Sequence, residues 1–241
     1  MNNLHDIPIS DAVIHCKIAG NKEAPVLILL HGNGEDLHIF DQQISYFSQY
    51  YRTIAIDTRG HGKSTRGTKP LNFHTFAADL VAVLDALQIE KVNIVGFSDG
   101  AITALHTALL APERVSAMVL LGVNYNTKGL RLIPRLLVLC MYAFLSAASL
   151  FSAKKRKQKE IWGLMVYLPK LTIEEISQIK IPTLVITGEK DMVCQRHNNK
   201  LSNAIAGSQR LIIQGGDHFW MFKHPDVLNE SVMKFFEKND I

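Results

Sequence analysis

Short apolar runs alternate with segments of helical periodicity along this chain, which predicts a sheet covered by helices. Residues 26–30 are apolar throughout, as expected of a parallel strand that is buried on both faces. Residues 12–18 alternate loosely and suit an early antiparallel strand. Further strands are predicted at residues 54–56, 91–95, 115–121, 182–187 and 209–213, and helices at residues 76–87 and 101–110. The pattern predicts an α/β fold with a mostly parallel central sheet.

Composition adds one feature to this picture, a local cluster of basic residues. The formal net charge is +4, but Lys154, Lys155, Arg156, Lys157 and Lys159 supply five positive charges, and the remainder carries a net charge of −1. Because the basicity is local, we predict no nucleic-acid partner. The run is either a solvated charge cluster or a weak contact to an anionic surface.

Length and cysteine usage favour one domain in a reducing compartment. The 241 residues suit a single domain, residues 1–241, with no second domain required. Cys16, Cys140 and Cys194 are scattered, so neither a disulfide framework nor a zinc site is predicted. The first six residues lack the basic start and apolar stretch of a secretory signal. We therefore expect a cytoplasmic protein without a metal.

The pentapeptide Gly96-Phe97-Ser98-Asp99-Gly100 carries the strongest chemical signal. It follows an apolar, β-branched run and precedes a segment rich in Ala and Leu that reads as a helix. A serine between a strand and a helix, with glycine two residues to either side, is typical of a sharp and crowded turn that exposes the hydroxyl. Ser98 is therefore the candidate nucleophile.

In this context the chain resembles the α/β-hydrolase family, and the resemblance covers nearly the whole sequence. The loop His31-Gly32-Asn33-Gly34 resembles the family's His-Gly-x-Gly loop. The resemblance implies an oxyanion hole formed by backbone N–H groups of Asn33 and Asp99, with His31 as a structural support. The alternative is an ordinary glycine-rich turn.

A second loop, residues 57–64, resembles the family's Asp-x-Arg-Gly-x-Gly-x-Ser loop and is assigned to structure. We expect Asp57 to pair with Arg59 and hold the turn. His61 and Ser64 are expected to be scaffold or surface residues.

Two later loops supply the partners of the serine. No carboxylate follows the strand at residues 115–121, where Asn124 stands, so the acid comes later. Residues 188–191 resemble the family's Gly-x-x-Asp acid loop, which favours Asp191 and leaves Glu189 as the alternative. Residues 215–218 resemble its Gly-x-x-His loop, so His218 is the candidate base. Neighbouring side chains point apart, which argues against Asp217 as the partner of His218.

Other positions receive no chemistry or a structural role from the sequence. His197 and His224 are expected in surface segments without a catalytic role. The family inserts a cap between the two halves of its sheet, at about residues 127–172 here. Residues 136–151 carry no charge and are shorter than the roughly 18 residues of a spanning helix, so we predict no stable membrane insertion. We expect them to form a lid, with Leu137 and Phe144 on an apolar pocket.

The resemblance implies a serine hydrolase for a small, largely apolar carboxylic ester, lactone or thioester, acting through an acyl-enzyme without a cofactor. A carbon–carbon bond hydrolase, an amidase and a cofactor-free perhydrolase share the same triad and stay open. Haloalkane dehalogenases and epoxide hydrolases of this fold use an aspartate nucleophile and are disfavoured by Ser98. A non-catalytic ligand-binding or membrane-surface protein on the same scaffold is the alternative of another class. The sequence indicates a small-molecule partner and leaves the oligomeric state undetermined.

Overall fold

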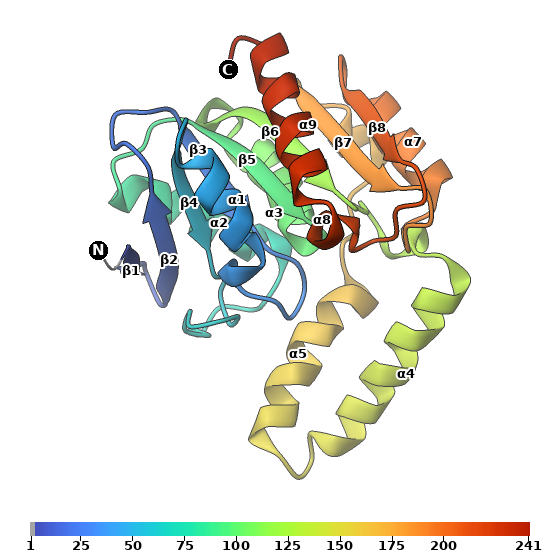
Figure 1. Cartoon of the computed structure of the whole chain (residues 1–241). Helices are drawn as coiled ribbons and strands as arrows, with labels where there is room; N and C mark the ends of the chain where they lie inside the picture. The colour runs from blue at the N-terminus through green and yellow to red at the C-terminus, as the bar shows by residue number, and fades with distance from the viewer. Residues whose placement is uncertain (1–2) are drawn as a thin grey trace.

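Eight strands form one sheet in the computed structural model, which describes residues 3–241 (Figure 1). Their order across the sheet is β1-β2-β4-β3-β5-β6-β7-β8. β1 and β2 pair antiparallel, β2 also pairs antiparallel with β4, and the pairs from β4 to β8 are parallel. The strands are β1 (Leu4–Pro8), β2 (Val13–Ala19), β3 (Val26–Leu30), β4 (Arg52–Ile56), β5 (Val92–Phe97), β6 (Val115–Leu121), β7 (Thr183–Gly188) and β8 (Gln209–Ile213). The predicted mostly parallel sheet is confirmed.

Helices cover both faces of this sheet (Figure 1). The α-helices are α1 (Asp41–Phe47), α2 (Phe73–Ala86), α3 (Asp99–Leu110), α4 (Leu132–Ala148), α5 (Ala153–Tyr167), α6 (Ile173–Ile176), α7 (Gln195–Ala204), α8 (Trp220–Lys223) and α9 (Pro225–Lys238). Short 3₁₀ helices lie at Leu37–Phe40, Pro112–Arg114 and Thr127–Gly129. α2 and α3 belong to one apolar cluster, and α1, α8 and α9 belong to the other.

The apolar strand β3 shows why the sheet is buried on both sides. Ile28 and Leu30 belong to the cluster that contains α2 and α3, whereas Leu27 and Leu29 belong to the cluster with α1 and α9. Because successive side chains of a strand point to opposite faces, a strand covered on both faces is apolar at nearly every position. The predicted burial of this strand on both faces is therefore confirmed.

Two boundaries differ from the sequence prediction for physical reasons. α2 begins at Phe73 rather than Phe76, because the side chain of Asn72 accepts the N–H of Thr75 at 2.8 Å and caps the helix. The edge strand β1 was not predicted. It pairs only with β2, and its mixed polar sequence lacks the apolar run that marks the inner strands.

α4 and α5 form a helical hairpin that extends away from the sheet, between β6 and β7 in the chain (Figure 1). The hairpin occupies the segment in which we predict the cap. Its root is tied to the loop after β7, because Arg131 donates its N–H to the carbonyl of Met192 and Cys194 donates to that of Gly129, both at 2.8 Å. Across residues 3–241, no helix is both long enough and apolar enough to cross a membrane.

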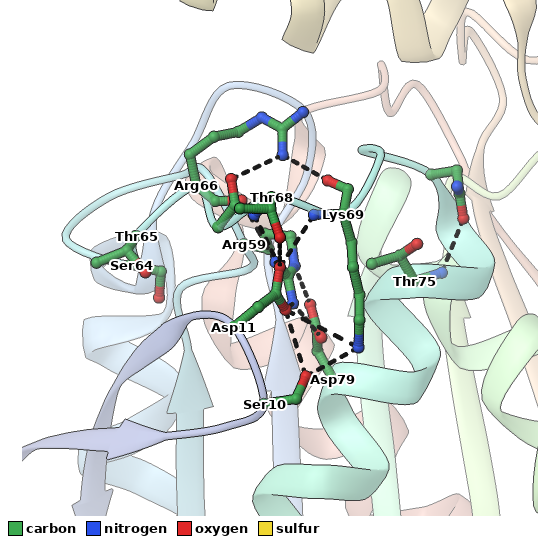
Figure 2. Close-up of polar contacts among 12 residues, drawn as sticks. Ser10, Asp11, Arg59, Ser64, Thr65, Arg66, Thr68, Lys69, Thr75 and Asp79 are labelled. Atoms are coloured by element: carbon green, nitrogen blue, oxygen red, sulfur yellow. Dashed lines mark hydrogen bonds and ion pairs between the residues drawn. The ribbon is translucent and has the colours of Figure 1, made fainter.

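The predicted pairing of Asp57 with Arg59 is wrong. Arg59 is buried and donates through Nε and Nη2 to Asp79 at 2.6 and 2.7 Å, and through Nη1 and Nη2 to Asp11 at 3.0 and 2.8 Å (Figure 2). These bonds and the backbone N–H of Lys69 hold the pKa of Asp11 well below its usual range. The guanidinium therefore joins β-strand loops to α2, instead of closing its own turn.

Asp57 holds the turn by a different route, through backbone groups. Its Oδ1 accepts the N–H of Leu37 at 2.7 Å, and its Oδ2 accepts the N–H of Lys63 at 2.8 Å. Ser64 donates to the Asp57 carbonyl at 2.6 Å, and His61 is buried with its pKa lowered to about 3 by desolvation. The structural assignment of Ser64 and His61 is confirmed.

Candidate active site

Ser98 stands in a strained turn between β5 and α3. Its φ is 51° and its ψ is −112°, a left-handed conformation that residues with a side chain rarely adopt. A Cβ on Gly96 would lie 2.5 Å from the Gly100 carbonyl oxygen, and one on Gly100 would lie 2.0 Å from the Leu30 carbonyl oxygen. The turn thus requires glycine at both flanking positions, which confirms the crowding predicted from the pentapeptide.

His218, in the loop between β8 and α8, lies between Ser98 and Asp191. Its Nε2 is 3.3 Å from the Ser98 hydroxyl oxygen, and its Nδ1 is 2.8 Å from Oδ1 of Asp191. An ionised carboxylate only accepts hydrogen bonds, so Nδ1 carries the proton and the neutral ring leaves Nε2 free to accept one from Ser98. The structure brings together the three residues that the sequence proposed, from loops after β5, β7 and β8.

Asp191 is fully buried and positioned by the backbone. Its Oδ1 also accepts the N–H of Val193 at 2.9 Å, whereas Oδ2 has no hydrogen-bond partner among the described residues. A desolvated carboxylate with so few partners interacts strongly with a positive charge on the adjacent ring. Asp191 thus fixes the orientation of the His218 ring through Nδ1.

Gly122, at the end of β6, is a site residue that sequence reasoning missed. Its φ is 58°, and a Cβ at this position would lie 2.6 Å from Cε1 of His218. The glycine therefore gives the imidazole ring its space. A glycine directly after a buried apolar strand was the available signal.

The loop after β3 reaches the nucleophile turn. A Cβ on Gly32 would lie 3.2 Å from Cβ of Ser98. The side chain of Asn33 donates to Oδ2 of Asp99 and to the carbonyl of Ile161 in α5, both at 2.9 Å. The Asn33 side chain thus links the nucleophile turn to the hairpin. The sequence had predicted a role only for the backbone N–H of this residue.

His31 supports this loop as a neutral ring. Its Nδ1 donates to the Gly32 carbonyl at 2.7 Å, and its Nε2 accepts the N–H of Thr58 at 3.0 Å. Burial lowers its pKa to about 4. Its hydrogen bonds and neutral state are those of a structural support, as predicted.

Two carboxyl groups near His218 have raised pKa values. Desolvation raises the pKa of Asp99 to about 6, against the lowering effect of the Asn33 hydrogen bond. Desolvation likewise raises the pKa of Glu35 to about 7, although its Oε2 accepts the N–H of Gly32 at 2.9 Å. Glu35 was missed because its position three residues after Gly32 matches no motif.

The alternative residues lie away from Ser98. Glu189 accepts the N–H of Gly215 at 2.8 Å, and Asp217 accepts from Lys223 at 2.8 Å. His224 is exposed, as expected.

The expectation of a surface position is wrong for His197. Its ring is buried, stacks on Tyr125 with ring centroids 3.8 Å apart, and accepts the Tyr125 N–H at 3.1 Å. Desolvation lowers its pKa to about 4. The helical pattern of α7 did not show that Tyr125, 72 residues earlier, would cover this ring.

A small cavity lies beside Ser98 and His218. Its apolar wall comes from α3, from the hairpin with its flanking segments, and from the loop after β7, namely Ile102, Leu130, Val138, Met165, Leu168, Pro169, Met192 and Val193. The expectation that Leu137 and Phe144 cover the pocket is wrong, because their side chains are exposed. Helical geometry turns Val138, one residue further, toward the cavity.

Comparison with known proteins shows which sequences and folds this chain resembles. The profile of the alpha/beta hydrolase fold matches residues 25–138. The serine hydrolase BPHL of Mus musculus is 28% identical over 96% of this chain and 85% of its own length. Epoxide hydrolase 3 of Siraitia grosvenorii is 38% identical over 52% of this chain, and the match covers only 40% of that enzyme.

The same fold extends over nearly the whole chain in a solved structure. The crystal structure of a hydrolase from Pseudomonas aeruginosa superimposes with a TM-score of 0.80, covers 97% of this chain and 98% of its own, and is 23% identical. The eight-stranded, mostly parallel sheet with helices on both faces is the architecture of the α/β-hydrolase fold. The chain has the α/β-hydrolase fold.

Proposed function

We propose that this protein is a serine hydrolase of small, largely apolar carboxylic esters or related lactones and thioesters. The observation that carries the proposal is the position of His218, 3.3 Å from the Ser98 hydroxyl and 2.8 Å from Asp191. A serine hydroxyl is a weak nucleophile at neutral pH, and an adjacent imidazole oriented by a carboxylate is the group that activates it. In apo structures such bonds are often long and tighten with substrate.

In this mechanism His218 takes the hydroxyl proton as the Ser98 oxygen attacks the acyl carbon. Backbone N–H groups of Asn33 and Asp99 stabilise the oxyanion that forms. His218 then gives its proton to the leaving alcohol or thiol, which leaves an acyl group on Ser98. Water, deprotonated by the same ring, attacks the acyl-enzyme and releases the acid. The hairpin segment, residues 127–172, acts as the cap that supplies the acyl pocket.

The choice of reaction class depends on the nucleophile and on the cavity. Ser98 favours acyl transfer over epoxide opening, despite the partial match to an epoxide hydrolase, because ester-type cleavage uses a hydroxyl nucleophile. The full-length similarity to a serine hydrolase supports the same choice. The apolar lining of the cavity favours uncharged acyl groups. Carbon–carbon bond hydrolysis and perhydrolysis use the same triad and are the alternatives.

Replacing Ser98 by Ala tests the proposal. A loss on the order of 10⁴-fold or more in p-nitrophenyl ester hydrolysis is expected, because a triad acts as a unit. Thermal unfolding of the variant, compared with that of the wild type, checks that the fold persists. A fluorophosphonate probe, read by peptide mass spectrometry, is expected to label Ser98 alone. Retention of more than about a tenth of the activity would exclude Ser98 as the nucleophile.

A further inference from the structure

The hairpin presents an unusual apolar surface to solvent. Of the residues in α4, Val138 and Leu145 are the buried apolar side chains that anchor the helix. At the turn into α5, the side chains of Leu150 and Phe151 are 75% and 89% exposed. We call the apolar face the exposed set Leu132, Ile133, Leu136, Leu137, Leu139, Met141, Phe144, Leu150 and Phe151. So many exposed apolar side chains on one hairpin are unusual for a folded protein and mark a candidate interaction site.

Five cations adjoin the apolar face. The basic run, Lys154, Lys155, Arg156, Lys157 and Lys159, directly follows Phe151 and begins α5. The ammonium of Lys155 lies 5.9 Å from the centre of the Phe144 ring. Among the ion pairs within residues 3–241, none involves these five side chains.

The position of the basic run is unfavourable within the protein itself. The N-terminus of a helix carries a partial positive charge, so cations there are repelled. The first turn of α5 contains no acidic residue to offset this. An external anionic surface would remove the conflict, since it supplies the negative charge that the fold lacks.

We propose that the α4–α5 hairpin docks onto an anionic lipid surface. The apolar face would enter the boundary between headgroups and acyl chains, with Leu150 and Phe151 deepest, while the basic run binds lipid phosphates. α4 has 17 residues, too few to span a bilayer, which suits a helix lying at the interface. The inference goes beyond the proposed function and does not depend on Ser98.

Charge favours a lipid surface over a second copy of this chain. A symmetric dimer through the apolar face would bring the same patch of both subunits together. Because the basic run adjoins that patch, the two runs would repel each other across the interface. An anionic bilayer instead complements both the apolar face and the basic run.

Vesicle sedimentation of the full chain tests the proposal. The wild-type protein is expected to bind phosphatidylcholine vesicles containing phosphatidylglycerol, and to bind pure phosphatidylcholine vesicles at least tenfold more weakly. Added salt is expected to weaken the first binding, since it screens the cations. Equal binding to both vesicle types, or binding to neither, would overturn the proposal.

Charge variants identify the cations involved. The triple variant Lys154→Gln, Lys155→Gln and Lys157→Gln is expected to lower partitioning on the order of a hundredfold, since each lysine near an anionic surface contributes roughly fivefold. The matched control removes the same charge elsewhere, at the exposed positions Lys22, Lys91 and Lys234. An equal loss in both triple variants would reduce the effect to net charge and overturn the docking assignment.

An apolar pair separates insertion from simple electrostatic attraction. Leu150→Ser with Phe151→Ser is expected to lower partitioning by about tenfold or more, because two apolar side chains no longer leave water. The control pair, Tyr50→Ser with Leu110→Ser, changes exposed apolar residues outside the hairpin. Light scattering on each variant reports the oligomeric state. The lipid assignment would be overturned in favour of a second copy if the wild-type protein were a dimer that bound no vesicles and only the Leu150→Ser, Phe151→Ser variant were monomeric.

Discussion

At the scale of single residues, the candidate site depends on backbone conformations that few side chains permit. Ser98 and Gly122 both have positive φ. Each lies against a residue of another loop, Ser98 against Gly32 and Gly122 against His218. The strain at Ser98 holds its hydroxyl toward His218, and the glycine opposite leaves space for the ring. Local conformation therefore determines whether the proposed triad can assemble.

Asp191→Asn tests the orienting role of the acid. An amide at this position offers its N–H₂ or an uncharged oxygen to Nδ1, so it neither holds the required tautomer nor stabilises the imidazolium. We expect kcat/KM for p-nitrophenyl butyrate to fall on the order of 10⁴-fold.

Two matched controls belong to the Asp191 test. Glu189→Gln and Asp217→Asn remove neighbouring carboxylates that bind Gly215 and Lys223 instead of the ring. Each is expected to change the rate by less than about tenfold. A loss for Asp217→Asn as large as that for Asp191→Asn would contradict the assignment of the acid.

At the scale of elements, the α4–α5 hairpin has two differently exposed parts. Its root lines the cavity through Val138 and Met165, and the side chain of Asn33 holds α5 by donating a hydrogen bond to the Ile161 carbonyl. Its tip exposes Leu150 and Phe151. The two proposals, substrate selection and surface docking, therefore concern different side chains of the same element.

Val138→Phe tests the root of the hairpin. The larger side chain fills part of the cavity beside Ser98, so esters with longer acyl chains are expected to lose about tenfold or more in kcat/KM relative to acetate. Leu137→Phe, on the exposed neighbour, is the matched control and is expected to leave the ratio unchanged. Equal effects of Val138→Phe on acetate and octanoate would mean that the cavity does not bind the acyl chain.

At the scale of the whole molecule, burial keeps several histidines neutral. Desolvation lowers the pKa of His31, His106 and His197 to about 4 and that of His61 to about 3. In the unfolded chain a histidine takes up a proton near pH 6.5. Below that pH the unfolded state binds more protons than the folded state, so these four groups lower the free energy of unfolding as the pH falls.

The carboxyl groups of Glu35 and Asp99 act in the opposite direction. Their raised pKa values, about 7 and about 6, let the folded state bind protons that the unfolded state releases, which adds stability in acid and loses it as the pH rises. In acid, the loss of stability from the four histidines exceeds the gain from the two carboxyl groups. We expect the free energy of unfolding to fall by roughly 1 to 3 kcal/mol between about pH 6 and pH 5.

Urea unfolding at a series of pH values measures this dependence. His61→Gln removes one of the neutral histidines and is expected to flatten the slope, whatever its effect on stability at pH 8. The exposed His224→Gln serves as the control and is expected to leave the slope unchanged. A free energy of unfolding that rises toward pH 5 in the wild type would contradict the balance of groups.

Much of this protein follows from its sequence, because the relevant physics is local. Apolar runs predicted the inner strands, since a strand covered on both faces is apolar along nearly its whole length. The glycines around Ser98 predicted the crowded turn, since only glycine fits there. The loops that carry Asp191 and His218 were predicted from their resemblance to loops of the α/β-hydrolase family, and the strands before them bring their side chains together.

Tertiary structure decided the features that depend on contacts between distant segments. Arg59 pairs with Asp11 and Asp79, which lie 48 and 20 residues away, because the sheet brings their loops together around the guanidinium. His197 is buried because Tyr125 covers it. Val138, and not Leu137, lines the cavity because the packing of α4 on α5 sets the rotation of the helix. Periodicity gives the faces of an element, but only its neighbours determine which face is buried.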